Sequence, residues 1–296
     1  MFRKIFIALS GAIIVLGVVL VTRTLIAGVV PAISDTPASP LALDAQSAAA
    51  RLAETVRLRT ISHGLDSEVS GEELRQFHSF LTQAFPIIHA TLERETVNEF
   101  SLLYRWEGTQ AELKPILISA HMDVVPIESG TEADWDHPPF AGAIADGFVW
   151  GRGTLDDKYA VLSVLEAVEA LLDEGFQPQR SVYFAFSHDE EIGGPNGTSG
   201  MAALLTERGI EFEFVLDEGS AIVQGLIAGI SRPVAIVGVA EKGIANVELV
   251  ASGNGGPASW PPRQSTIAAI GRAVDAVERN PMPAMLRSPV SDMLDH

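Results

Sequence analysis

Four short motifs between residues 115 and 220 carry the side chains best suited to chemistry. In chain order they read AHMDVVP, GRGTLDDK, FSHDEEIGG and FVLDEGS. They offer imidazole and carboxylate groups, which bind divalent metal ions and transfer protons. The sequence contains no cysteine, so thiolate ligands are excluded and a metal ion would be held by His, Asp and Glu.

The first motif pairs His121 with Asp123. Two residues apart at a strand end, these side chains project the same way. Asp123 can therefore accept a hydrogen bond from one imidazole nitrogen while the other nitrogen binds a metal. The alternative is a histidine that is hydrogen-bonded within the core.

The other motifs supply acids in clusters. Asp156 and Asp157 stand at a predicted helix entrance, where they either cap the helix or bridge two cations. The three acids from Asp189 to Glu191 follow an apolar strand and would repel one another unless a cation lies among them or one is protonated. An exposed acidic turn is the alternative for this cluster. The acid pair in FVLDEGS repeats the pattern at a third strand end.

Alternating strands and helices are needed to bring these motifs together. Short apolar runs at 115–120 and 181–187 predict buried strands, and apolar residues at helical spacing predict a helix at 160–175 that Gly175 ends. This alternation predicts an α/β fold with a largely parallel sheet, which places its site at the carboxyl ends of the strands. Further helices are predicted at 41–56 and 71–85, and further strands at 90–97 and 100–108.

The composition excludes one class of partner. Of the 296 residues, 47% are hydrophobic and 20% charged, which is typical of a globular protein with a sizeable core. The net charge of −18 and the lack of a Lys/Arg cluster argue against a nucleic-acid partner, because binding a phosphate backbone requires a basic surface.

The first 23 residues predict a membrane anchor. Residues 5–22 are almost wholly apolar and are flanked by Arg3, Lys4 and Arg23. Such a run is long enough to cross a bilayer, although a cleaved signal peptide is the alternative. The flanking charges predict that the rest of the chain lies outside the cytoplasm, periplasmic or extracellular, or secreted if the segment is cleaved. The proline-containing residues 24–43 predict a linker.

The motifs HMDVVP, WDHPPF, GRGTLDDK, DEEIGG and LDEG resemble those of a zinc-dependent exopeptidase and deacylase family. This family includes aminoacylase, acetylornithine deacetylase, succinyl-diaminopimelate desuccinylase and carboxypeptidase S. The chain is most similar to the carboxypeptidase S branch, whose secreted mammalian relatives act on N-acyl amino acids. The resemblance implies a mostly parallel-sheet catalytic domain at 44–240. It also implies the beginning of a smaller α+β lid domain at 241–296, with a strand at 243–252 and a helix from residue 264. Relatives that dimerise often do so through this lid.

The resemblance also implies roles for the residues of the first two motifs. His121 would be a terminal ligand of one zinc ion and Asp123 its orienting partner. Asp156 would bridge two zinc ions, and its bond to Asp157 would be the cis peptide of the family.

The third and fourth motifs take the remaining roles that the resemblance implies. Glu190 would be the general base and Glu191 a ligand of the second zinc ion. Either Asp217 or Glu218 would complete the first zinc site, with Glu218 preferred. The implied reaction is hydrolysis of an amide bond in a peptide or N-acyl amino acid by a zinc-activated water.

The sequence departs from the family pattern in two places. Pro257 stands where relatives commonly have a histidine that stabilises the oxyanion. Relatives also continue beyond a segment such as this one to supply the last zinc histidine, and His296 is not expected to replace it. The alternative hypothesis is therefore a truncated or inactive relative that retains metal binding as a binding module or fragment.

Overall fold

The computed structural model divides into two compact units, one of residues 37–219 and one of residues 1–36 with 220–296. The residues that the structure describes are 2–26, 41–65, 67, 69–219, 222–226, 230–257, 259–260 and 262–295. Most of the predicted linker at 24–43 and also His296 lie outside the described residues. The domain boundaries predicted at residues 23, 43 and 240 stay predictions.

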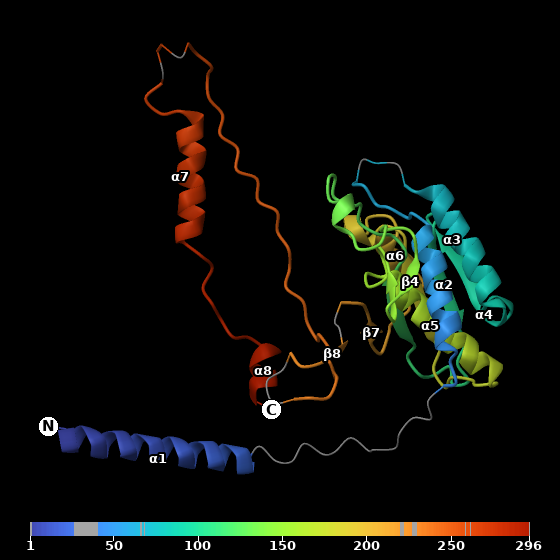
Figure 1. The fold of residues 1–296 in the computed structure, drawn as a ribbon, viewed down its shortest axis with the longest axis horizontal. Helices are drawn as coiled ribbons and strands as arrows, with labels where there is room; N and C mark the ends of the chain where they lie inside the picture. The colour runs from blue at the N-terminus through green and yellow to red at the C-terminus, as the bar shows by residue number, and fades with distance from the viewer. Residues whose placement is uncertain are drawn as a thin grey trace. The chain divides into compact units, whose positions relative to one another are not determined.

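The unit of residues 37–219 is built on a five-stranded mixed sheet (Figure 1). Its parallel half consists of β6, β3 and β7, and its antiparallel half runs from β6 through β2 to β1. The predicted α/β class is confirmed, and the sheet is parallel where the motifs lie. In sheet order the strands are β1 (Glu93–Val97), β2 (Ser101–Trp106), β6 (Val182–Ser187), β3 (Ile116–His121) and β7 (Val215–Leu216).

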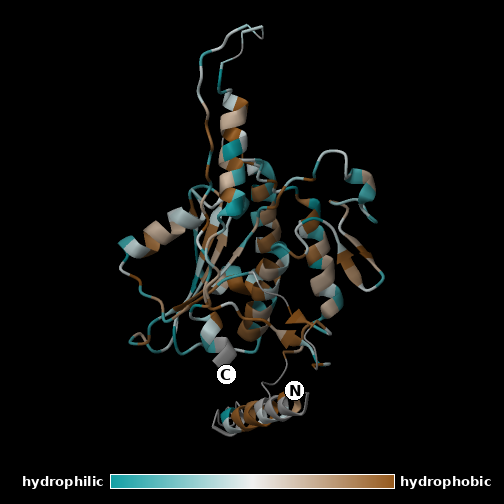
Figure 2. Cartoon of the chain, turned by 90° about the vertical axis from the view of Figure 1, so that its left-hand side faces the viewer, coloured by the Kyte–Doolittle hydropathy of each residue, from teal (hydrophilic) through white to brown (hydrophobic). Residues whose placement is uncertain are grey.

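Helices cover both faces of this sheet because successive strand residues point to opposite sides. On one face, helices α3, α4 and α5 pack their apolar residues against Tyr104 and Phe186. On the other face, Met201 and Leu205 of α6 pack against Leu103. Figure 2 shows hydrophobic colours on several of the strands and helices of the chain. The helices of this unit are α2 (Ala45–Arg57), α3 (Gly71–Ala84), α4 (Pro86–Thr91), α5 (Lys158–Asp173) and α6 (Thr198–Glu207).

Short elements complete the unit. Gly175 follows α5 with a φ of 73°, the left-handed conformation that ends helices, as predicted. A small antiparallel hairpin that the sequence analysis does not predict pairs β4 (Ala143–Ala145) with β5 (Phe148–Trp150). The 3₁₀ turns are η1 (Glu132–Asp134) and η2 (Glu190–Ile192).

The unit of residues 1–36 and 220–296 has little sheet among its described residues. Its elements are α1 (Phe2–Ile26), β8 (Ile222–Val223), β9 (Val234–Ala235), α7 (Thr266–Arg279) and α8 (Val290–Asp295). The helix expected after residue 264 is confirmed as α7. The strand expected at 243–252 is wrong, since these residues are described and pair with no other strand.

The membrane anchor predicted for residues 1–23 requires a correction. Crossing a bilayer takes about 20 consecutive apolar residues in one helix. Among the residues that the structure describes, no helix meets that requirement of length and apolarity. By this criterion the predicted anchor is wrong, and the placement of the rest of the chain outside the cytoplasm, which was derived from it, is withdrawn.

Candidate metal centre

The parallel half of the sheet brings three of the four motifs to one edge. His121, the last residue of β3, pairs with Ser187, the last residue of β6. Ile118 of β3 pairs with Leu216, the last residue of β7. The chain leaves β6 into the acids at 189–191 and leaves β7 into the acids at 217–218, so these groups meet where sequence reasoning expects a site.

The imidazole of His121 lies at the centre of this edge and is only 1% exposed. Its Nε2 atom lies 2.9 Å from Asp156 Oδ1, 3.4 Å from Glu218 Oε2 and 3.8 Å from Glu190 Oε2. Burial alone would lower the pKa of His121, but hydrogen bonds to Asp123 and Glu218 raise it to about 12. Several carboxylates thus converge on one nitrogen, an arrangement that calls for a positive charge between them.

Asp123 lies behind the imidazole and is almost fully buried. Its Oδ1 atom is 3.3 Å from His121 Nδ1, on the side of the ring opposite the other acids. The carboxylate also accepts hydrogen bonds from the backbone amides of Glu190 and Glu191, both at 3.1 Å. Burial opposes ionisation, but the hydrogen bonds from His121 and Ser62 prevail and lower the pKa of Asp123. Asp123 therefore stays an anion that holds both the ring and the following acidic turn.

The glycine-rich motif places Asp156 and Asp157 against the end of β3. Gly153 has a φ of 84°, and a Cβ atom there would lie 2.7 Å from a methyl group of Val124, so the close approach needs glycine. The bond between Asp156 and Asp157 is a cis peptide, as the family resemblance implies. The Asp156 carboxylate faces His121, whereas Asp157 is buried behind it.

The turn after β6 carries Glu190 and Glu191 on 3₁₀ helix η2. Asp189, the first acid of the motif, points away from the site and accepts hydrogen bonds from the amides of Asn196 and Gly197, which fixes the turn. Burial raises the pKa of Glu190. Burial and then the charge of Asp156 raise the pKa of Glu191 to about 7.

Asp217 and Glu218 leave β7 in different directions. Asp217 accepts a hydrogen bond of 2.6 Å from the Ser119 hydroxyl, whereas Glu218 reaches His121. Ligand atoms of His121, Asp156 and Glu218 all lie within 4.8 Å of one another. One imidazole and two carboxylates are ligand types that bind zinc in proteins.

An orphaned atom next to these residues supports the fit of a cation. Asp157 Oδ1 is buried without a hydrogen-bond partner among the described residues, and Asp157 Oδ2 accepts only a 3.4 Å bond from the His121 amide. Burial and then the charge of Glu218 raise the pKa of Asp157 to about 7. A divalent cation at the nearby ligand set would offset this excess of negative charge.

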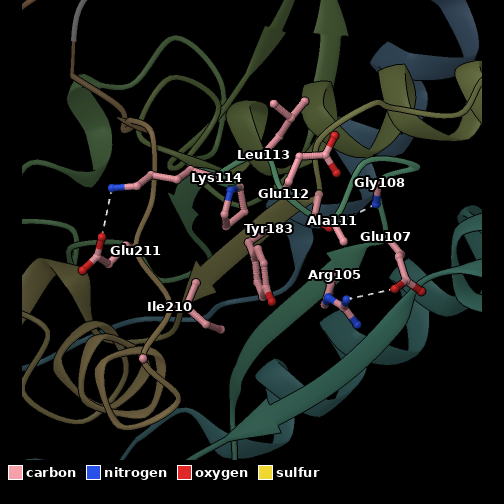
Figure 3. A pocket seen from close by; sticks show the side chains of 13 residues that line it. Arg105, Glu107, Gly108, Ala111, Glu112, Leu113, Lys114, Tyr183, Ile210 and Glu211 are labelled. Atoms are coloured by element: carbon pink, nitrogen blue, oxygen red, sulfur yellow. Dashed lines mark hydrogen bonds and ion pairs between the residues drawn. The ribbon is translucent and has the colours of Figure 1, made fainter.

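The metal centre opens into a hollow of about 300 Å³. His121, Glu190 and Glu218 line it together with apolar side chains of α6, so a substrate could approach the acids from this side. A second hollow, of about 410 Å³, lies at the amino ends of β3 and β6, where the exposed pairs Lys114–Glu211 and Arg105–Glu107 border it (Figure 3). None of its lining residues belongs to the four motifs, so it is separate from the metal centre.

Two residues that touch the site were not predicted from the sequence. The Ser62 hydroxyl donates a hydrogen bond of 2.6 Å to Asp123 Oδ2. The buried Lys158 ammonium donates to the carbonyls of Thr55, at 2.9 Å, and Leu58, at 2.6 Å, and burial lowers its pKa to about 7. The motif GRGTLDDK contains Lys158, but Ser62 lies in a stretch that carries no recognisable signal.

A buried histidine facing acids at the carboxyl edge of an α/β sheet is an arrangement that metal-dependent hydrolases use. The sequence model that describes peptidase family M20/M25/M40 matches residues 117–293 of the chain. The chain therefore belongs to this enzyme family, and the resemblance drawn from the motifs is confirmed.

Curated relatives agree with this assignment. The chain is 44% identical over 243 residues to probable carboxypeptidase S-like 2 of Dictyostelium discoideum, which covers 81% of this chain and 46% of that protein. It is 38% identical over 244 residues to N-fatty-acyl-amino acid synthase/hydrolase PM20D1 of Xenopus tropicalis, covering 81% and 47%. Carboxypeptidase S of Saccharomyces cerevisiae is 38% identical over 213 residues, covering 70% and 36%. The chain thus spans about half the length, or less, of these relatives.

Proposed function

We propose that this protein hydrolyses an amide bond in a peptide or an N-acyl amino acid and that zinc is its metal. The observation that carries the proposal is the convergence of Asp156, Glu218 and Glu190 on Nε2 of the buried His121. Family membership supports a metal-dependent reaction, and the names of the relatives supply the two substrate classes.

His121, Asp156 and Glu218 would hold the first zinc ion. Asp156 and Glu191 would contribute to a second, with Asp156 as the bridge. Bound zinc polarises a carbonyl oxygen and lowers the pKa of a water molecule. Asp217 is the weaker candidate, because its carboxylate is already engaged by Ser119.

Glu190 is the proposed general base. Its carboxylate is 3.8 Å from His121 Nε2 and half exposed, so it stands beside the ligand set and lines the open hollow. Burial raises its pKa, which brings it closer to neutral pH and suits a group that first accepts a proton from water and then gives it to the leaving amine. Asp123 keeps the imidazole in the orientation that turns Nε2 toward the metal.

The alternative hypothesis, a relative that keeps metal binding without turnover, makes a different prediction for the same site. It predicts metal binding but no effect of Glu190 on any reaction. Pro257 cannot act as a hydrogen-bond donor, and its effect on oxyanion stabilisation stays a prediction. A homodimer formed through residues 241–296 also stays a prediction.

The substitution Glu190→Gln tests the function. It keeps the size of the side chain and removes its basicity, so hydrolysis of dipeptides and N-acyl amino acids should fall by about a hundredfold to ten-thousandfold. Zinc content, measured by inductively coupled plasma mass spectrometry, should not change. Glu207→Gln, at the exposed end of α6, is the matched control. Equal turnover by wild type and Glu190→Gln would contradict the role of base.

A further inference from the structure

The residues that follow α2 form a short segment, 58–62. This segment contacts Lys158, the last residue of the glycine-rich motif, and the loop after β3. At its beginning, the Leu58 carbonyl accepts a hydrogen bond from Lys158, the first residue of α5, which directly follows Asp156 and Asp157. Lys158 also donates to the carbonyl of Thr55 in α2. At its end, Ser62 reaches Asp123, which belongs to the loop after β3. We refer to residues 58–62 as the strap.

The strap is held along the loop after β3 by several hydrogen bonds. Thr60 Oγ1 donates to the Met122 carbonyl at 2.6 Å, and the Thr60 carbonyl accepts from the Val124 amide at 3.0 Å. The Ser62 amide donates to the Val124 carbonyl at 3.0 Å, and Ile61 forms a parallel bridge with Val124. The backbone that carries Ser62 is therefore held against the loop after β3.

The carboxylate of Asp123 accepts three hydrogen bonds and lies against His121 Nδ1, which is also hydrogen-bonded to the Asp123 main-chain carbonyl at 3.0 Å. Its Oδ1 atom faces His121 Nδ1 and the Glu190 amide, at 3.3 and 3.1 Å. Its Oδ2 atom faces the Glu191 amide and the Ser62 hydroxyl, at 3.1 and 2.6 Å. Ser62 makes the shortest of these contacts, and the other three come from residues to which the proposed function gives roles.

We propose that Ser62 is a positioning residue of the metal centre. Its hydroxyl fixes the rotation of the Asp123 carboxylate, so that Oδ1 stays on Nδ1 of His121 and Nε2 stays directed at the metal. Loss of such a partner behind a ligating histidine typically weakens metal affinity about tenfold to a hundredfold. This inference rests on the proposed function, because it assumes that His121 binds zinc.

Zinc affinity of Ser62 variants tests the inference. Zinc dissociation constants would be measured by competition with a chromophoric chelator, and folding of each metal-free protein by thermal unfolding. Ser62→Ala should weaken zinc binding about tenfold or more. Ser62→Thr keeps the hydroxyl and should restore an affinity close to wild type, which a loss of packing alone would not explain.

Ser70→Ala is the matched control. The Ser70 hydroxyl donates 2.8 Å to the Ile61 carbonyl, so this variant loosens the strap without removing a contact to Asp123. Its zinc affinity should stay near that of wild type. Unchanged affinity in Ser62→Ala, or equal losses in Ser62→Ala and Ser70→Ala, would overturn the role of Ser62 alone. A wild-type protein that binds no zinc would overturn the proposed function as well.

Discussion

At the residue scale, the two ring nitrogens of His121 contact different acids. Nδ1 faces the buried Asp123, and Nε2 faces Asp156 together with Glu190 and Glu218, which line the hollow. Asp123 also accepts hydrogen bonds from the backbone amides of Glu190 and Glu191. One carboxylate therefore orients both the imidazole ring and the turn that carries the proposed base. A change at Asp123 would therefore disturb both metal binding and proton transfer.

A histidine away from the site gives a prediction about pH. His78 of α3 is partly buried, and its Nε2 atom donates a hydrogen bond of 2.8 Å to the Phe100 carbonyl. Burial lowers its pKa to about 4. The unfolded chain has the ordinary pKa of 6.5, so it binds a proton more readily than the folded chain. The stabilising contribution is complete above about pH 6.5 and is lost as the pH falls toward 4. We expect His78→Gln, which can still donate to Phe100, to flatten this acid loss.

Urea unfolding of wild type and His78→Gln across this pH range measures the effect. His63→Gln, a change at an exposed histidine, is the control. Parallel curves for wild type and His78→Gln would contradict the assignment.

At the residue scale, the sequence alone predicted which residue types gather but not how the side chains point. His121 and the acids of four motifs were identified because they stand at strand ends in a recognisable order. The register between Asp217 and Glu218 could not be decided, because it depends on where the two-residue strand β7 stops and on the hydroxyl of Ser119. Ser62 was missed because its contact with Asp123 spans 61 positions in the chain.

At the scale of secondary-structure elements, the amino terminus of α4 is capped by a carboxylate from α5. The short helix α4 begins at Pro86, and the amides of Ile87 and Ile88 both donate 2.9 Å to the carboxylate of Glu169 in α5. The charge also interacts favourably with the helix amino terminus. We expect Glu169→Ala to lower the free energy of unfolding by about 1–2 kcal/mol.

Chemical denaturation would measure this loss. Glu112→Ala, at an exposed turn residue, is the control and should change stability by less than about 0.5 kcal/mol. A Glu169→Ala variant as stable as this control would show that the capping contact does not stabilise the fold.

Elements with clear hydrophobic periodicity were predictable, and elements defined by partners were not. The strands at β3 and β6 and the helix α5 follow from runs of apolar residues that need burial. The strands expected at 90–97 and 100–108 are present as β1 and β2, but no local pattern specifies their antiparallel pairing. The strand expected at 243–252 failed for the same reason, because residues with strand propensity form a strand only where a partner pairs with them.

At the scale of the whole molecule, the two units differ in what they supply to the proposed site. Every residue of the candidate metal centre belongs to the unit of residues 37–219. The family match extends to residue 293, so it also covers much of the second unit. Since the chain spans only about half of its matched relatives, the activity of the whole protein rests on the proposal and not on the comparison.

Zinc titration of the full chain and of two neighbouring variants tests the central claim most directly. Isothermal titration calorimetry would compare wild type with Glu218→Gln and Asp217→Asn, changes at adjacent positions that remove one charge each. If Glu218 is a ligand, Glu218→Gln should weaken zinc binding by at least the roughly tenfold loss seen for partners behind a ligand, while Asp217→Asn stays close to wild type. Zinc binding that is absent in wild type, or weakened only by Asp217→Asn, would contradict the account.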